Sequence, residues 1–290
     1  QPEDHGFDFS IAERGIANSM KPNRLNDFST TDTNDPYRLD ENGFPRDPNN
    51  ENALAFLEQA KDKPFFLYYA TWLVHAPIQM RSKRLLEKYC DKMNVPFPTD
   101  PVGWEIEGQK NPYYGAMVEM FDYYVGQVIN YLKTTDDPRW KGHKLIENSY
   151  IIFASDNGGM EGHPGEIYTD NYPLDKGKIN AKEGGTRVPL IITGPGIKPD
   201  QESEVMVNGV DFYPTILSWT ETEYTAKKEL DGVDLSTLLK TNPTDKGLLV
   251  DKTGKVRNTM IHHFPHSSFQ STIRIGDYKF IHNYDPLKAN

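Results

Sequence analysis

Three short, dense runs of apolar residues stand out along the chain, and each is bounded by proline, glycine or polar turn residues. They cover residues 65–70, 149–154 and 188–193. Apolar runs of this length are typical of strands that are buried on both faces of a parallel sheet. The pattern therefore predicts three buried strands that lie far apart in the sequence.

Helical periodicity fills much of the chain between these runs. The strongest helix is expected over residues 113–133, because apolar residues recur there at three- and four-residue spacing. Shorter helices are expected over residues 52–60, 82–92 and 211–219.

Near the C-terminus the pattern changes from helical to alternating. Residues 271–275 and 278–282 alternate on either side of Gly276-Asp277, which predicts a β-hairpin. Alternation of helices with buried strands followed by short antiparallel strands predicts an α/β fold, in which a largely parallel sheet is flanked by helices. We expect residues 1–235 to belong to this α/β domain and residues 236–290 to begin a smaller antiparallel subdomain.

Composition narrows the possible functions. The chain has 290 residues and a net charge of -10, which argues against nucleic-acid binding because that function needs a basic face. No apolar run approaches the roughly 20 residues that a membrane-spanning helix requires. Cys90 is the single cysteine, so no disulfide can form within the chain, and we expect a semi-buried thiol.

Candidate chemistry follows two of the predicted strands. In open α/β sheets, ligands bind beyond the carboxyl ends of the strands. Asp156 and Asn157 follow the second run and offer hard oxygen donors, which suit Ca²⁺ or Mg²⁺. His75 follows the first run. For both sites a structural role stays open, as an Asp-Asn-Gly turn and as a hydrogen-bonded histidine.

Two further segments carry charged or titratable side chains. Lys178 precedes a glycine turn, and a lysine suits a tetrahedral oxyanion as a compact point charge. Arg187 either binds an anion or, as we expect, pairs with Glu183. His262, His263 and His266 precede the predicted hairpin, where they are pocket contacts, surface residues or a zinc site.

Six motifs, in this order and at this spacing, resemble those of the sulfatase family in the alkaline-phosphatase-like superfamily. Within residues 178–189 the sequence is similar to the signature K-G-x-x-x-E-G-G-x-R-V-P, with Ile179 where glycine is usual. Residues 155–159 match the metal-binding S-D-N-G motif of the family. The other motifs are residues 4–8, 64–68 with 75–77, 211–217 and 274–280.

The resemblance implies a set of roles. Asp156 and Asn157 would bind a divalent cation, usually Ca²⁺, with Mg²⁺ as the alternative. Lys178 would bind the sulfate, His75 would contact the sulfate and the ester oxygen, and His263 would contact the substrate. In the family a formylglycine hydrate attacks sulfur and the alcohol leaves. The implied partner is a sulfated small molecule or glycan, and the implied location is outside the cytoplasm (periplasmic, lysosomal-like or secreted).

The chain also departs from the family. Formylglycine arises from Cys or Ser in C/S-x-P-x-R, and these 290 residues do not contain that motif. Residues 20–24 have its proline and arginine, but Met20 stands at the nucleophile position, so we interpret the match as chance. We therefore expect the C-terminal portion of a longer sulfatase, inactive without its N-terminal segment.

Two other functions stay open at this point. One is a phosphomonoesterase or phosphodiesterase of the same superfamily, although Asn157 stands where such enzymes often have histidine. The other is a non-catalytic relic that binds sulfated glycans through Lys178 and His75.

Overall fold

The computed structural model describes residues 2–19, 28–98, 109–161, 168–225, 228–251, 253–265 and 269–285. The chain divides into two compact units. The first consists of Gln1–Asn148 and Gly159–Pro173, and the second of Ser149–Gly158 and Leu174–Asn290. The predicted boundary at residue 235 stays a prediction.

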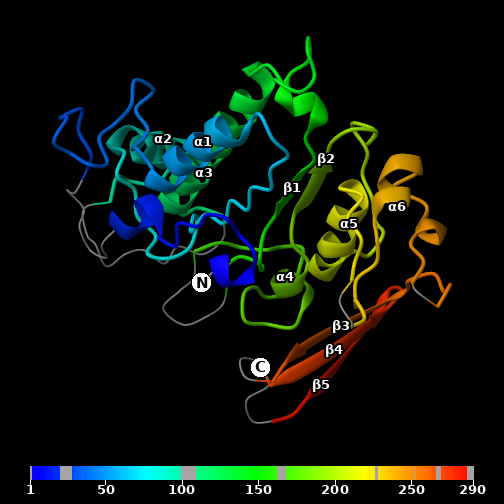
Figure 1. The fold of residues 1–290 in the computed structure, drawn as a ribbon. Helices are drawn as coiled ribbons and strands as arrows, with labels where there is room; N and C mark the ends of the chain where they lie inside the picture. The colour runs from blue at the N-terminus through cyan, green and yellow to red at the C-terminus, as the bar shows by residue number, and fades with distance from the viewer. Residues whose placement is uncertain are drawn as a thin grey trace. The chain divides into compact units, whose positions relative to one another are not determined.

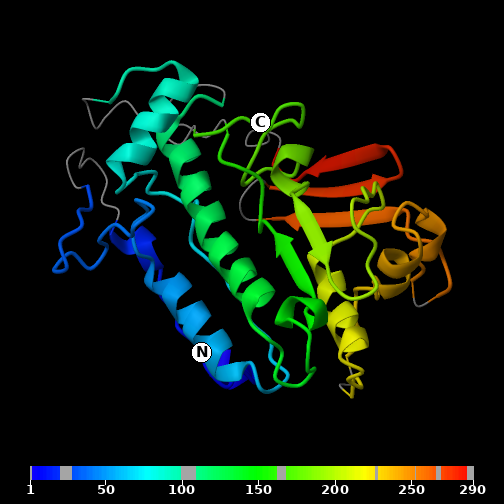
Figure 2. The same cartoon turned by 90° about the horizontal axis from the view of Figure 1, so that it is seen from above.

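The first unit is built on three helices. They are α1 (Pro48–Ala60), α2 (Lys83–Met93) and α3 (Pro112–Thr134). The long helix α3 contacts both of the others and runs beside them (Figures 1 and 2). The helices predicted over residues 52–60, 82–92 and 113–133 are thereby confirmed. Fully buried apolar side chains from α2 and α3 form the core, namely Leu85, Leu86, Ala116, Met117 and Met120. None of the described helices is both long and apolar enough to cross a bilayer.

Asp47 explains why α1 begins earlier than the sequence pattern predicts. Its carboxylate accepts a hydrogen bond from the Asn49 backbone N–H, and Pro48 occupies the first turn, as is usual at helix starts. The same carboxylate accepts the Ile16 N–H over 2.7 Å. This hydrogen bond joins α1 to the 3-10 helix η2 (Gly15–Ser19). The other short 3-10 helices of the first unit are η1 (Pro2–His5) and η3 (Leu145–Asn148).

The predicted strand over residues 65–70 is wrong. The segment has no strand pairing among the described residues, and its side chains alternate between half-buried and exposed. Phe66 is 55% exposed and Tyr68 is 72% exposed. An apolar run can fix which side chains point inward, but a strand also needs a neighbour that pairs with its backbone.

The second unit contains β1 (Ile151–Ala154) and β2 (Leu190–Thr193), the other two predicted strands. They pair antiparallel, with Ile151 opposite Thr193 and Ala154 opposite Leu190. The expected parallel pairing is therefore wrong for these two strands. A parallel pair needs a crossover connection, usually a helix, whereas the described part of this connection contains only the four-residue α4 (Glu183–Thr186).

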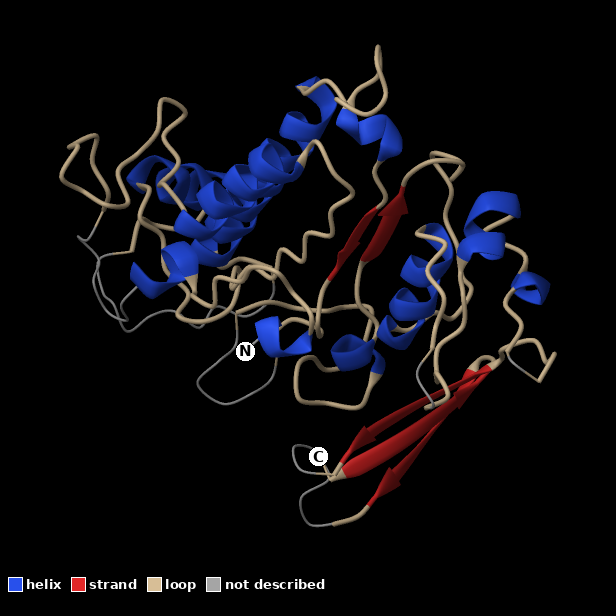
Figure 3. Ribbon diagram, in the orientation of Figure 1, coloured by secondary structure: helices blue, strands red, loops and turns tan. Residues whose placement is uncertain are grey.

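A three-stranded antiparallel sheet completes the second unit (Figure 3). Its strands are β3 (Thr259–Phe264), β4 (Gln270–Ile275) and β5 (Tyr278–Asn283), in that order. The β4–β5 hairpin confirms the prediction, whereas β3 was not predicted from the sequence. The remaining elements are η4 (Gly209–Asp211), α5 (Phe212–Trp219), α6 (Ser236–Thr241) and η5 (Lys246–Leu248).

A buried ion pair joins the start of α5 to the strand region of this unit. Asp211 is fully buried, and both of its carboxylate oxygens accept from the Arg257 guanidinium, over 2.5 and 2.8 Å. The same carboxylate accepts the backbone N–H groups of Asn208 and Val233, over 2.7 and 2.9 Å. One side chain thus connects three separate segments.

Candidate active site

The loop after β1 carries Asp156, which is exposed, and Asn157, which is half-buried. The Ser155 hydroxyl donates to the Asn157 carbonyl over 2.7 Å, and the Asn157 side-chain amide donates to the Gly158 carbonyl over 3.0 Å. The amide nitrogen of Asn157 is used in this way, and its side-chain oxygen remains a hydrogen-bond acceptor.

Asp156 and Asn157 fit a hard divalent cation by donor type, since carboxylate and amide oxygens suit Ca²⁺ and Mg²⁺. They would supply two of the roughly six to eight oxygens that Ca²⁺ takes. Over the described ranges, no group of three or more His, Cys, Asp or Glu side chains is arranged to hold a metal.

Glycines allow the backbone of this loop to lie in direct contact with the backbone of α4. The Gly158 N–H donates to the Gly185 carbonyl over 3.1 Å. A Cβ on Gly158 would lie 1.6 Å from the Gly184 oxygen, and a Cβ on Gly184 would lie 1.8 Å from the Lys176 oxygen. No side chain fits at such distances. The loop with Asp156 and the loop with Lys178 therefore pack on one short helix.

Lys178 is half-buried in the loop before α4, and the backbone around it is unusual. Ile179 has φ 70° and Lys176 has φ 64°. The positive φ of Ile179 explains why the sulfatase motif usually has glycine after this lysine. A β-branched residue is an outlier in this region of conformational space.

Replacing Ile179 by glycine is expected to stabilise the second unit by about 1 kcal/mol. Relief of strain outweighs the larger entropy that glycine loses on folding. Urea denaturation measures the difference in the free energy of unfolding. Ile179→Val, which keeps a β-branched residue at this φ, should give no gain, and a lower stability for Ile179→Gly would contradict the argument.

Glu183, the first residue of α4, is paired differently from the expectation. Its carboxylate accepts from Arg274 and from Lys279, each over 2.8 Å. Burial alone would raise the pKa of Glu183, but the hydrogen bond from Lys279 and the charges of Lys279 and Arg274 lower it overall. Arg187 is exposed and forms no ion pair with Glu183 among the described residues, so the predicted buried pair is wrong, although the charge of Arg187 also lowers the pKa of Glu183. Arg274 and Lys279 belong to the motif at residues 274–280, and this role for them was not predicted from the sequence.

The neighbouring histidines His262 and His263 lie on opposite faces of the three-stranded sheet, since adjacent strand residues alternate. His263 is exposed, and its Nδ1 forms a hydrogen bond with the Ser271 hydroxyl. His262 lies on the face that carries Arg274 and Lys279. His266 and residues 20–24 are outside the described residues.

His75 lies in the first unit, in an exposed turn. Its backbone N–H donates to the Trp72 carbonyl over 2.9 Å, and its ring is 5.2 Å from the Trp72 ring between centroids. The Nδ1 atom lies 2.9 Å from the Ala76 carbonyl, which can only accept. Nδ1 therefore carries a proton in this contact.

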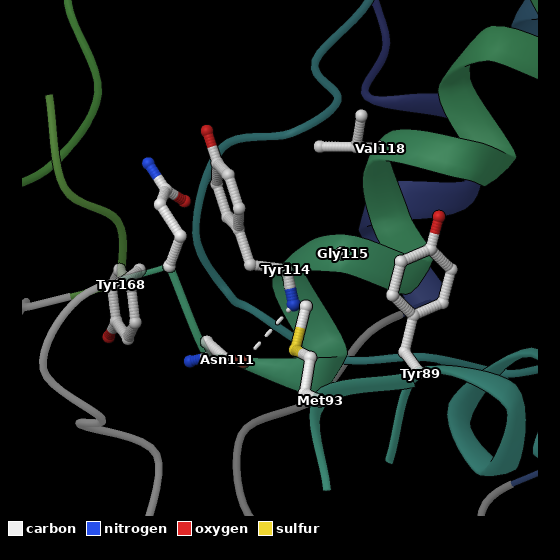
Figure 4. Close-up of a pocket in the computed structure, with 8 residues that line it drawn as sticks. Tyr89, Met93, Asn111, Tyr114, Gly115, Val118 and Tyr168 are labelled. Carbon is white, nitrogen blue, oxygen red and sulfur yellow. Dashed lines mark hydrogen bonds between the residues drawn. The ribbon is translucent and has the colours of Figure 1, made fainter. Parts of the chain in front are cut away.

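A pocket of about 240 Å³ in the first unit contains none of the predicted site residues. Figure 4 shows Tyr89 and Met93 from α2 beside Tyr114 and Gly115 from α3. A Cβ on Gly115 would lie 2.5 Å from the Tyr89 ring, so this glycine makes room for the ring. Cys90, also on α2, is buried in the helical core.

Comparison with known proteins agrees with the motifs. The family model described as Sulfatase matches residues 2–222. A sulfatase from Formosa agariphila is 36% identical over 186 residues, which are 62% of this chain and 30% of that protein. The N-acetylglucosamine-6-sulfatase of Homo sapiens is 30% identical over 220 residues, or 71% of this chain and 38% of that enzyme. The crystal structure of Ps i-CgsB superimposes with a TM-score of 0.60 at 25% identity, over 82% of this chain and 46% of that one.

The chain belongs to the sulfatase family, because the family model covers most of its length. The resemblance seen in the sequence is thereby confirmed, and so is the α/β fold class of the alkaline-phosphatase-like enzymes. The chain spans 30% and 38% of the two relatives' lengths.

Proposed function

We propose that the protein is a sulfuric ester hydrolase that removes sulfate from a carbohydrate, with a divalent cation and formylglycine as its cofactors. One observation carries the proposal. In a chain of the sulfatase family, backbone contacts pack the Asp156 loop and the Lys178 loop on the same short helix, α4. A cation ligand pair and an anion-binding lysine placed on one rigid element are what a sulfate ester requires.

Each predicted site residue has a proposed role in that reaction. Lys178 binds the sulfate and offsets negative charge on its oxygens as the ester bond breaks. Asp156 and Asn157 hold Ca²⁺, or Mg²⁺ in its place, through their oxygens. His75 contacts the sulfate and the ester oxygen. Those oxygens only accept hydrogen bonds, and Nδ1 already bonds to a carbonyl, so this contact requires a proton on Nε2 as well.

The nucleophile is proposed to come from a formylglycine outside these residues, in an N-terminal segment of the same gene product. The motif C/S-x-P-x-R is missing from the 290 residues, and the relatives are longer than this chain. The hydrated aldehyde supplies a hydroxyl nucleophile for sulfur, which no side chain of the described site replaces. On this proposal the 290 residues alone do not hydrolyse sulfate esters.

The proposed substrate is a sulfated carbohydrate, with a sulfated N-acetylhexosamine as the first compound to test. The human relative is named for N-acetylglucosamine 6-sulfate, and this chain shares 30% identity with it. Substrate contact by His263 stays a prediction, and its exposed position on the sheet favours the surface alternative. Export from the cytoplasm, which the family resemblance implies, also stays a prediction.

The proposal predicts metal-dependent release of sulfate. Protein that carries this chain and a formylglycine should release sulfate from N-acetylglucosamine 6-sulfate, measured by ion chromatography. Chelation by EDTA should abolish the release, and added Ca²⁺ should restore it, because Asp156 and Asn157 need the cation as a partner. Asp156→Ala should require a higher Ca²⁺ concentration for half-maximal rate. Undiminished turnover in EDTA would contradict the assigned metal site.

Binding without turnover would instead support the glycan-binding alternative. In that case the same protein, with its formylglycine verified by mass spectrometry, would bind the sulfated sugar in calorimetry and release no sulfate.

A further inference from the structure

The three-stranded sheet is bonded to both ends of the short helix α4. The ammonium of Lys279 on β5 donates to the Glu183 carboxylate over 2.8 Å and to the Thr186 hydroxyl oxygen over 3.1 Å. Glu183 is the first residue of α4 and Thr186 is the last. Arg274, directly opposite Lys279 on β4, donates to the other oxygen of the same carboxylate over 2.8 Å. Two neighbouring strands therefore bind one four-residue helix.

Lys279 is the more shielded of the two cations. Its side chain is 13% exposed, whereas that of Arg274 is 28% exposed. A partly buried ion pair is screened less by solvent and salt than a surface pair. The Thr186 hydroxyl that accepts from Lys279 also donates to the Lys182 carbonyl, over 3.2 Å. One ammonium thus belongs to a connected set of hydrogen bonds that runs along α4.

The same helix contacts both loops of the candidate site through its backbone. The Gly184 N–H donates over 2.9 Å to the carbonyl of Asp175, in the loop before α4. The Gly158 N–H, in the loop after β1, donates over 3.1 Å to the Gly185 carbonyl. Because these glycines leave no side chain between the backbones, a displacement of α4 reaches both loops directly.

We propose that Lys279 is a positioning residue of the active site. Through Glu183 and Thr186 it fixes α4, and α4 in turn sets where Lys178 and the loop with Asp156 lie. The effect on turnover rests on the proposed function. Lys279 touches neither substrate nor cation in this account and acts only through the helix. Residues that orient metal ligands from behind typically change metal affinity or activity by about 10–100-fold.

Hydrogen exchange of backbone amides, followed by NMR in the 290-residue chain, tests the positioning without turnover. Lys279→Met removes the ammonium and keeps a side chain of similar length. The Gly158 and Gly184 N–H groups should then exchange about 10 times faster or more, because α4 loses charge-assisted hydrogen bonds and opens more often. The Leu239 N–H of α6, which donates to the Leu235 carbonyl over 3.0 Å, should keep its rate.

Three further variants complete the exchange experiment. Lys279→Arg keeps the charge and the donors, so it should restore most of the protection. Lys198→Met removes the same charge at an exposed position and should leave all three amides unchanged. Thr186→Val removes one contact of the ammonium and should accelerate the two glycine amides by a smaller factor, even if Lys279→Met does not fold.

Two results of the exchange experiment would overturn the proposal. One is unchanged exchange of the glycine amides in Lys279→Met and Thr186→Val. The other is equal acceleration of the glycine amides and of the Leu239 amide, which would show a loss of global stability rather than a local release of α4.

Kinetics of protein that carries formylglycine give a second reading. Lys279→Met should lower kcat/KM for a sulfate ester by about 10–100-fold and raise the Ca²⁺ concentration for half-maximal rate. Lys279→Arg should recover most of both. A merely structural role would reduce the amount of folded protein and leave the Ca²⁺ requirement of the remainder unchanged, which would contradict the proposal. If the wild-type protein releases no sulfate, the proposed function fails, whereas the exchange rates still decide the role of Lys279.

Discussion

Replacing Asp211 by alanine is expected to destabilise the second unit by about 3–5 kcal/mol, the usual loss when one partner of a buried ion pair is removed. The substitution leaves the Arg257 guanidinium without the carboxylate that now accepts two of its hydrogen bonds. It also removes the acceptor for the backbone N–H groups of Asn208 and Val233. The loss therefore affects three segments at once.

Urea denaturation of the 290-residue chain, followed by tryptophan fluorescence and by circular dichroism, measures this loss. Asp231→Ala, at an exposed position near the same segment, is the control and should change stability by less than about 0.5 kcal/mol. If orphaned Arg257 causes much of the loss, the double variant Asp211→Ala/Arg257→Met should recover part of it. If the free energy of unfolding of Asp211→Ala lay within about 1 kcal/mol of the wild-type value, the ion pair would be dispensable for stability.

Lys178→Ala should lower kcat/KM for a sulfate ester by about 10²–10³ in protein that carries formylglycine. This is the typical effect of removing one group that stabilises charge on the reacting oxygens. The lysine stands on a loop whose backbone packs against α4, and its side chain is half-buried, unlike that of a fully exposed surface cation. The expected loss is therefore larger than that of a surface cation.

The control for this experiment is Lys198→Ala, at an exposed position in the second unit. It removes the same charge and should leave kcat/KM unchanged, apart from a small effect that disappears at high salt. Equal losses for the two variants would mean that Lys178 acts only through net charge. Full activity of Lys178→Ala would remove this residue from the site.

Local patterns predicted the helices well because their causes are local. The apolar stripe of α3 and the caps of α1 and α2 all involve residues within a few positions of each other. The strands depended on partners elsewhere in the chain. Residues 65–70 have the apolar composition of a strand but no described neighbour pairs with them. The direction of β2 against β1 follows from the connection between them, which composition does not reveal.

The candidate site shows the same division. Sequence motifs located Asp156, Asn157 and Lys178, but not the glycine contacts that hold their loops on α4. Glu183 has a nearby arginine in sequence, yet its partners Arg274 and Lys279 are 91 and 96 residues away. In a strand, a shift of one position moves a side chain to the other face. The triplet of histidines alone therefore could not show that His262, rather than His263, lies on the face that carries Arg274 and Lys279.

Hydrolysis of sulfate esters is the activity that we propose for this protein. The most direct measurement compares two substrates of the same shape, N-acetylglucosamine 6-sulfate and N-acetylglucosamine 6-phosphate, with one preparation that carries formylglycine. We predict release of sulfate at a rate that depends on Lys178 and on Ca²⁺, with phosphate released far more slowly. Rapid release of phosphate without release of sulfate would contradict the claim and identify a phosphatase of the same fold.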